Sequence, residues 1–191
     1  MKKWIWIAVA VVAAIFLYAT YNGLVNKEEG VNTAWAHVET QYQRRADLIP
    51  NLVNTVKGYA AHERQTLDEV TEARAKATSI NLSVDELTPE NMAAFQQAQA
   101  DVRSALGRLV AVAEQYPDLK ANRNFLELQA QLEGTENRIA VARKDFNEAA
   151  QRYNVAVRRF PAVLVAKLFG FRQKPYFEAA EGAAAAPQVQ F

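Results

Sequence analysis

A chain of 191 residues is long enough for one modest domain, and its 22 basic and 21 acidic side chains leave a formal net charge of +1. This balance argues against a nucleic-acid-binding protein, which carries a basic excess on one face. The absence of cysteine excludes disulfides, thiolate metal sites and cysteine nucleophiles.

The N-terminus predicts a membrane anchor. No residue from Trp4 to Tyr21 is charged, and a helix of this length spans roughly 27 Å, close to the hydrocarbon core of a bilayer. Trp4 and Trp6 at one end and Tyr18 and Tyr21 at the other are placed like interfacial aromatic belts. A cleaved signal peptide is the alternative, but no A-x-A site closes the apolar run. We therefore expect residues 1–24 to be an uncleaved anchor.

The charges beside the anchor predict its orientation. Lys2 and Lys3 precede it, whereas Lys27 is the one basic residue that follows within about 20 residues of its end. Because positive residues favour the cytoplasmic side, we expect a cytoplasmic N-terminus and an extracytoplasmic body. In a Gram-negative cell, this places the anchor in the inner membrane and the body in the periplasm.

The next stretch has the pattern of a long helix. Apolar or small residues recur at alternating steps of three and four from Val31 to Ala77, which predicts one helix roughly 70 Å long. Arg45, Glu63 and Arg74 are polar interruptions of this stripe.

Pro50 lies inside this predicted helix. Proline cannot donate to the carbonyl of Ala46 and clashes with the preceding turn, so we expect a kink or break there.

A loop at residues 79–88 precedes the second helix. Ser83 and Glu86 have the spacing of a capping box. Thr88 is placed as an N-cap, with Pro89 at the first helical position.

Two further helices follow. The second, roughly 43 Å long, stops at Pro117, and the third keeps one apolar stripe from Phe125 to Phe160. The apolar segment from Ala162 to Phe171 is too short to span a bilayer.

These elements predict an all-α fold. We expect an antiparallel bundle of three long helices, the first kinked at Pro50, plus a short C-terminal helix, behind one N-terminal transmembrane helix. The expected divisions are the anchor at residues 1–24, the bundle at residues 25–171 and a flexible C-terminal tail at residues 172–191.

Several short runs resemble the LemA family. They are YQRRADLIPNLV at 42–53, VKGYA at 56–60, HE at 62–63, YPDLKAN at 116–122, TEN at 135–137, YN at 153–154 and FP at 160–161, with YN at 21–22 and AW at 34–35. The resemblance covers nearly the whole chain. It implies a bacterial helical bundle behind one N-terminal membrane helix, in a family for which no enzymatic activity is established.

The predicted helix lengths suggest a polar cluster at the kink. Because the second helix is shorter than the first, the turn at residues 116–122 should lie beside Pro50. The expected members of this interaction cluster are Arg44, Arg45, Asp47, Pro50, Asp118 and Lys120. One donor is expected to reach the carbonyl freed at Ala46. The alternative is a set of solvated charges that face away from one another.

An odd number of long helices would place the segment from Ala162 to Phe171 at the end of the bundle far from the membrane. There it would be a cap on the bundle or a contact surface for another subunit, a partner or a second membrane. Arg172 and Lys174 beside it suit anionic lipid.

No motif in the chain indicates catalysis. His62 and Glu63 begin like a zinc-protease HExxH motif, but position 66 is Thr and the second ligand is missing. We expect no catalytic, cofactor-binding or metal-binding residues and no cofactor.

The C-terminal residues Val189, Gln190 and Phe191 resemble the ends that PDZ domains bind by strand addition. The alternative is a tail that has no partner.

The leading hypothesis is a non-catalytic membrane-anchored scaffold of the bacterial envelope that forms homo-oligomers in the lipid bilayer. The second is an adaptor or sensor for an envelope partner, such as a PDZ-containing protease, bound through the tail or the cluster from Arg44 to Pro50. No nucleic-acid partner is expected.

Overall fold

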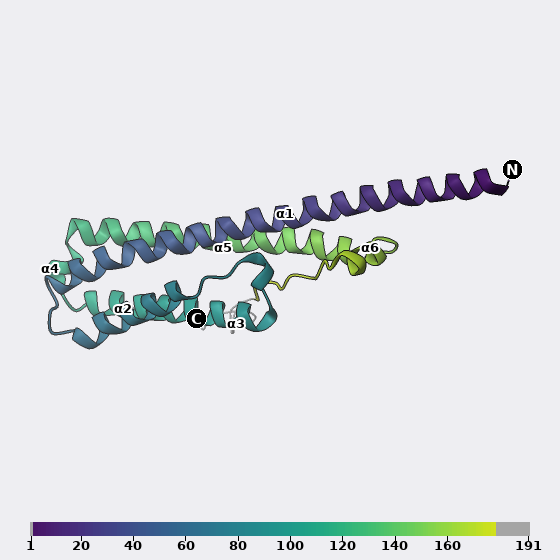
Figure 1. The fold of residues 1–191 in the computed structure, drawn as a ribbon. Coiled ribbons are helices and arrows are strands. Elements are labelled where there is room, and N and C mark those ends of the chain that lie inside the picture. The colour runs from purple at the N-terminus through teal and green to yellow at the C-terminus, as the bar shows by residue number, and fades with distance from the viewer. Residues whose placement is uncertain (1, 179–191) are drawn as a thin grey trace, which may run out of the picture.

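The computed structural model describes residues 2–178, which form six α-helices and one 3-10 helix. The elements are α1 Lys2–Lys57, α2 Arg64–Ser79, η1 Val84–Glu86, α3 Pro89–Ala113, α4 Pro117–Lys120, α5 Arg123–Arg158 and α6 Ala162–Phe169. The long helices lie side by side with alternating direction (Figure 1). The predicted all-α antiparallel bundle is confirmed, and the described residues contain no strand.

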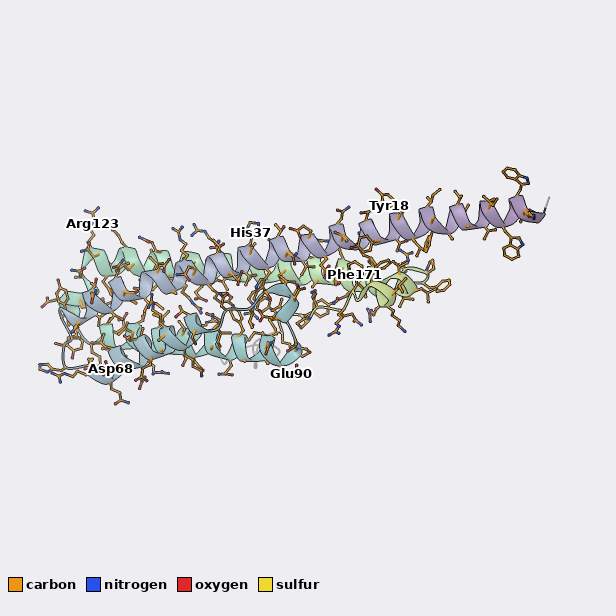
Figure 2. The ribbon with its side chains drawn as sticks, in the orientation of Figure 1. Tyr18, His37, Asp68, Glu90, Arg123 and Phe171 are labelled. Carbon is orange, nitrogen blue, oxygen red and sulfur yellow. The ribbon has the colours of Figure 1, made fainter. Side chains whose placement is uncertain are left out.

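α1 extends beyond the other helices at its N-terminal end, where Tyr18 lies on the projecting part (Figures 1 and 2). Residues 3–19 are exposed, and the first buried side chain is that of Leu24. An 18-residue window of this helix has a mean hydropathy of 2.0, and none of that window is buried. Among the described residues, α1 is the one helix long and apolar enough to cross a membrane.

The first long helix does not run to Ala77 as predicted. α1 ends at Lys57 and α2 begins at Arg64, so the chain reverses at residues 58–63. Gly58, a weak helix former by about 1 kcal/mol against alanine, opens this turn. The apolar period continues across the break because Val56, Ala60 and Leu67 all pack into one core. Periodicity alone therefore could not detect the reversal.

This extra reversal changes where the chain ends. With α2 as a separate helix, α5 runs back toward the projecting end of α1 (Figure 1). α6 then packs beside α1, and the ring centroids of Tyr21 and Phe169 are 4.9 Å apart. The prediction that the segment from Ala162 to Phe171 lies at the far end is wrong, because it rested on an odd number of long helices.

Pro50 is accommodated inside α1, which continues for about two more turns to Lys57. The carbonyl of Ala46, four residues earlier, accepts a hydrogen bond from Arg74 Nε of α2 at 2.7 Å. A side-chain donor thus replaces the N–H that proline lacks.

The predicted helix starts are confirmed. The backbone N–H of Ser83 donates to Glu86 Oε2 at 2.9 Å in the capping box. Thr88 Oγ1 accepts from the backbone N–H of Asn91 at 3.2 Å, and Pro89 is the first residue of α3. Similarly, Asn122 Oδ1 accepts from Phe125 N at 3.0 Å and caps α5.

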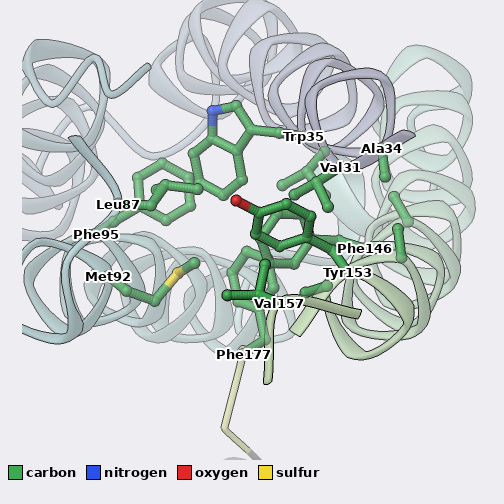
Figure 3. Close-up of a cluster of buried hydrophobic side chains, with 14 of the residues drawn as sticks. Val31, Ala34, Trp35, Leu87, Met92, Phe95, Phe146, Tyr153, Val157 and Phe177 are labelled. Carbon is green, nitrogen blue, oxygen red and sulfur yellow. The ribbon is translucent and has the colours of Figure 1, made fainter. Parts of the chain in front are cut away.

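The buried side chains form two clusters. The cluster nearer the projecting end of α1, here called the proximal core, is rich in aromatic rings from α1, α3, α5 and residues 171–178 (Figure 3). Trp35 is central to it, with ring centroids 5.4 Å from those of Phe95 and Phe146 and 6.0 Å from that of Phe177. The cluster at the other end, the distal core, is built mainly from Leu, Val, Ile and Ala of α1, α2, α3 and α5.

Residues 171–178, here called the strap, follow α6 in an extended conformation and pack onto the bundle. Asn154 Nδ2 donates to the carbonyl of Lys174 at 2.8 Å, and its Oδ1 accepts from Lys174 N at 2.9 Å. Asn147 binds the backbone of Phe177 in the same two-bonded way. The flexible tail was predicted to start at residue 172. Because Lys174 and Phe177 are buried, the packed part of the chain extends beyond that residue.

Candidate functional site

A buried arginine separates the two cores. Arg45 follows Tyr42, the last α1 residue of the proximal core, and precedes Ile49, the first α1 residue of the distal core. Its side chain is only 3% exposed. A charge at this depth needs partners that replace its hydration.

α3 and α5 supply these partners. Arg45 Nη1 donates to Glu136 Oε1 at 2.7 Å, while Nη2 donates to both the backbone carbonyl and the side-chain oxygen of Gln99. The guanidinium carbon lies 5.1 Å from the centre of the Tyr42 ring, within cation–π range. We call Arg45, Gln99 and Glu136 the polar layer. Because its members come from three helices, it fixes the register of α1 against α3 and α5.

A groove of about 740 Å³ opens beside the polar layer. It is lined by α1 residues 36, 39–47 and 49, by α2 residues 74, 77 and 78 with the following residues 80 and 81, and by α3 residues 95, 99 and 102. Its polar rim includes Glu39, Arg44 and Arg74. Gln41 Oε1, also in the lining, is buried and has no hydrogen-bond partner among the described residues. The groove is thus a concavity with both polar and apolar lining that could take the surface of a partner.

Burial raises the pKa of two ionisable groups in the groove. It raises the pKa of the Glu39 carboxyl above its ordinary value. It also raises the pKa of the Tyr42 hydroxyl, against the opposing effect of Arg143 and Arg45. Tyr42 therefore stays neutral at physiological pH and acts as an aromatic surface for Arg45.

The predicted cluster at the kink is not assembled as expected. Arg45 is buried in the polar layer, Arg44 is exposed in the groove, and Asp47 accepts a hydrogen bond from Gln43. Lys120 instead pairs with Glu114 beyond the end of α3.

The turn that carries Asp118 and Lys120 lies at the far tip of the bundle. Asn122 Nδ2 donates to the hydroxyl of Tyr59 at 2.8 Å, just past the end of α1. This end is roughly 18 Å along the helix from Arg45, so the two groups of charges are separate. The prediction was wrong because it used the length of a single helix running to residue 77.

The other predicted site residues divide between the projecting helix and the undescribed terminus. Trp4, Trp6 and Tyr18 are exposed on the apolar part of α1, and Tyr21 contacts the rings of Phe169 and Phe171. Val189 and Phe191 lie outside the described residues.

Sequence reasoning missed the partners of Arg45, although a signal was present. Gln99 falls in the same helical stripe as Met92, Phe95 and Val102, so it is a polar residue at a core position. Arg45 and Arg74 also interrupt an apolar stripe. Polar residues in such stripes indicate a buried polar contact, but the pairing depends on helix register, which one stripe does not contain.

A second buried cation ties the strap to the bundle. Lys174 Nζ lies 3.4 Å from Glu28 of α1 and 3.2 Å from Asp85 of η1, and it donates to the carbonyl of Val84. Tyr153 donates to the same Glu28 carboxylate, and burial together with this negative charge raises the pKa of its hydroxyl strongly. Asn147 and Asn154 of α5 also bind the strap, through its backbone.

The ionisable groups at these two sites are engaged in contacts within the bundle. In the part of the chain that the structure describes, no group of three His, Asp or Glu side chains is placed to hold a metal ion. His37 points outward from α1 (Figure 2). The ionisable groups of the polar layer bind one another across helices, which is a structural arrangement.

Comparison with known proteins gives one family. The sequence model of the LemA family matches residues 34–191. The chain is 28% identical to Magnetosome protein MamQ 2 of Paramagnetospirillum magneticum, over 89% of this chain and 70% of that protein. It is 28% identical to Magnetosome protein MamQ of Magnetospirillum gryphiswaldense, over 90% and 71% respectively. It is 25% identical to Protein LemA of Metamycoplasma hominis, over 84% and 69%.

Proposed function

Because this chain belongs to the LemA family, whose sequence model matches residues 34–191, we propose that it is a non-catalytic scaffold of the bacterial envelope. In this proposal α1 holds the bundle on the membrane, and the bundle acts by binding other copies of the chain. The names of the relatives state no reaction, which agrees with a role in assembly.

The observation that carries the proposal is the continuity of α1. The helix runs for 56 residues, about 84 Å, from the apolar stretch into both cores. Leu24 is already buried three residues after Tyr21, so no flexible linker separates the apolar stretch from the bundle. A bundle joined in this way is held at a fixed angle to its anchor, as a scaffold requires.

The orientation in the membrane is part of the proposal. Lys2 and Lys3 favour a cytoplasmic N-terminus, which places the bundle outside the cytoplasm, in the periplasm of a Gram-negative cell. Since the chain lacks cysteine, an Arg123→Cys variant at the exposed far tip has a single reactive thiol (Figure 2). A membrane-impermeant maleimide should label intact cells as fully as lysed cells. Labelling that occurs only after lysis would show the opposite orientation, with the bundle in the cytoplasm.

The outer side of α5 is the proposed contact between copies. Leu126, Val141 and Val155 are large apolar side chains exposed there. At about 100° per residue, their spacing places them within about 60° of one another around the helix. A repeated apolar line on one flank suits a two-fold contact in which the same surface is used twice.

Cross-linking tests this contact. In membranes, Val141→Cys should form disulfide-linked dimers under mild oxidation. Ala100→Cys, an exposed position on α3, is the matched control and should not. The mass of the full chain in detergent should exceed that of a monomer. A monomer at micromolar concentration, with no cross-link at position 141, would reject the scaffold.

The groove beside the polar layer favours a second candidate function, that of an adaptor or sensor for an envelope protein. Its rim offers Glu39, Arg44 and Arg74 to a polar partner surface. The tail Val189-Gln190-Phe191 is the alternative attachment point for a PDZ-containing protease. Deletion of Phe191 should abolish binding through the tail, whereas Arg44→Glu should weaken binding through the groove.

A further inference from the structure

α6 has apolar side chains on two opposite sides. Val165 and Ala166 face the bundle and are each 1% exposed. Leu164 and Leu168, one helical turn apart, face away and are 61% and 71% exposed. Within residues 2–178 no other segment covers this outward side. Together with Phe160 and Phe169, which are also exposed, these leucines form what we call the base patch.

The base patch lies where the apolar stretch of α1 meets the bundle. Tyr21, the last residue of that stretch, contacts Phe169 and Phe171 with ring centroids 4.9 and 5.7 Å away. Figure 2 shows Phe171 at the end of the bundle from which α1 projects toward Tyr18. The patch therefore continues the apolar surface of the anchor at the level of the membrane interface.

The stretch of chain that carries the patch has charges of one sign. Residues 149–177 contain six basic residues and no acidic residue. Arg158, Arg159, Lys167 and Arg172 are exposed within this stretch. Lys174 differs, because it is buried and pairs with Glu28 and Asp85. Exposed basic groups beside exposed apolar side chains are the combination that binds an anionic lipid surface.

From these observations we propose that α6 lies in the interface of the same bilayer that α1 crosses. Its base patch enters the boundary between headgroups and acyl chains, and the basic residues beside it bind anionic headgroups. The base patch lies close to this bilayer because the rigid junction at Leu24 keeps α6 next to the anchor. The bundle then has two attachments to one membrane. This inference requires the α1 anchor but not the contact between copies on α5.

Spin labelling of the full chain tests the location of α6. Leu168→Cys carries the label, in vesicles of phosphatidylcholine with anionic phosphatidylglycerol. Oxygen, which concentrates in lipid, should reach the label readily, whereas a water-soluble nickel complex should not. The lipid reference is Leu17→Cys on the projecting part of α1, and the aqueous reference is Ala100→Cys on α3.

The outcomes separate the possible occupants. Nickel accessibility at position 168 equal to that at position 100 would mean a solvated face and overturn the proposal. Low accessibility to both reagents, with spin–spin broadening that disappears on dilution with unlabelled chain, would assign the face to a second copy and also overturn it. Neither result alters the expected cross-link at Val141. The proposed location of α6 can therefore fail while the proposed contact between copies on α5 stands.

A charge variant tests the basic residues. Arg158→Gln with Arg159→Gln should raise nickel accessibility at position 168. The labelled chain that keeps both arginines should show the same rise in vesicles of phosphatidylcholine alone. Ala100→Cys on α3 provides a control label that neither change should affect. If nickel accessibility at position 168 rises neither with the arginine substitutions nor with the change of lipid, the proposed role of anionic lipid is overturned.

Discussion

The proximal and distal cores use the same helices but are built differently. The distal core contains all four long helices and is mostly aliphatic. In the proximal core α2 has already ended, and its place is taken by residues 80–88 and the strap. Trp35 Nε1 donates to the carbonyl of Leu82 at 2.8 Å there, a bond that joins a helix to a loop.

This difference shows two ways of completing a four-sided bundle. The distal half repeats one apolar period on each helix, so its packing follows from local pattern. The proximal half lacks one helix and closes with aromatic rings and with polar groups that bind the backbone of extended segments. Such segments cannot satisfy their own backbone groups, and Asn147 and Asn154 provide the missing partners.

The largest expected effect breaks the proximal half alone. Phe177→Ala should destabilise the chain by about 3–5 kcal/mol, because a buried ring is lost from contact with Trp35, Phe95 and Phe146. Hydrogen exchange should show faster opening of the strap, with α2 unchanged. The exposed neighbour Tyr176→Ala is the control. Equal opening of both halves would show that they do not behave separately.

A somewhat smaller effect is expected at the boundary between the two cores. Arg45→Ala should cost about 3 kcal/mol, at the low end for a broken buried pair because Glu136 is 34% exposed. The loss also leaves Gln99 without its donor. Denaturant unfolding in detergent measures this change. The exposed neighbour Arg44→Ala should stay within about 0.5 kcal/mol, and equal losses would contradict a structural polar layer.

A gain of about 0.5–1 kcal/mol is expected from Gly107→Ala in the distal half. A Cβ at this helical position meets no atom within 4 Å, so alanine adds helix propensity without a clash. Gly134→Ala in α5, equally open, should give a similar gain. Thermal unfolding measures both. A loss in either variant would reveal packing that the open space does not indicate.

The smallest effect concerns pH. Hydrogen bonds from Gln97 and Lys76 hold the pKa of Asp101 below its ordinary value. A lowered pKa in the folded state adds stability above the unfolded pKa of about 3.9, and this is lost as the pH falls through the folded pKa. Asp101→Asn should therefore lower the melting temperature slightly at pH 7 and leave it unchanged at strongly acidic pH. Equal shifts at both would exclude the charge as the cause.

Local pattern was enough for much of this architecture. The uncharged run from Trp4 to Tyr21, the caps at Ser83 and Thr88 and the stripe of α5 all follow from residues close in sequence, because helix period and capping act within one or two turns. The all-α class and the apolar projecting helix could be predicted for this reason.

Tertiary structure decided the rest. The reversal at residues 58–63 is hidden because Val56, Ala60 and Leu67 keep one period on both sides of it. That single reversal sets the direction of every later helix, and so places Lys120 at the far tip and α6 beside Tyr21. The partners of Arg45 and Lys174 are likewise distant in sequence. A stripe indicates which side of a helix is buried, but only the packed lengths and register of all the helices determine what that side meets.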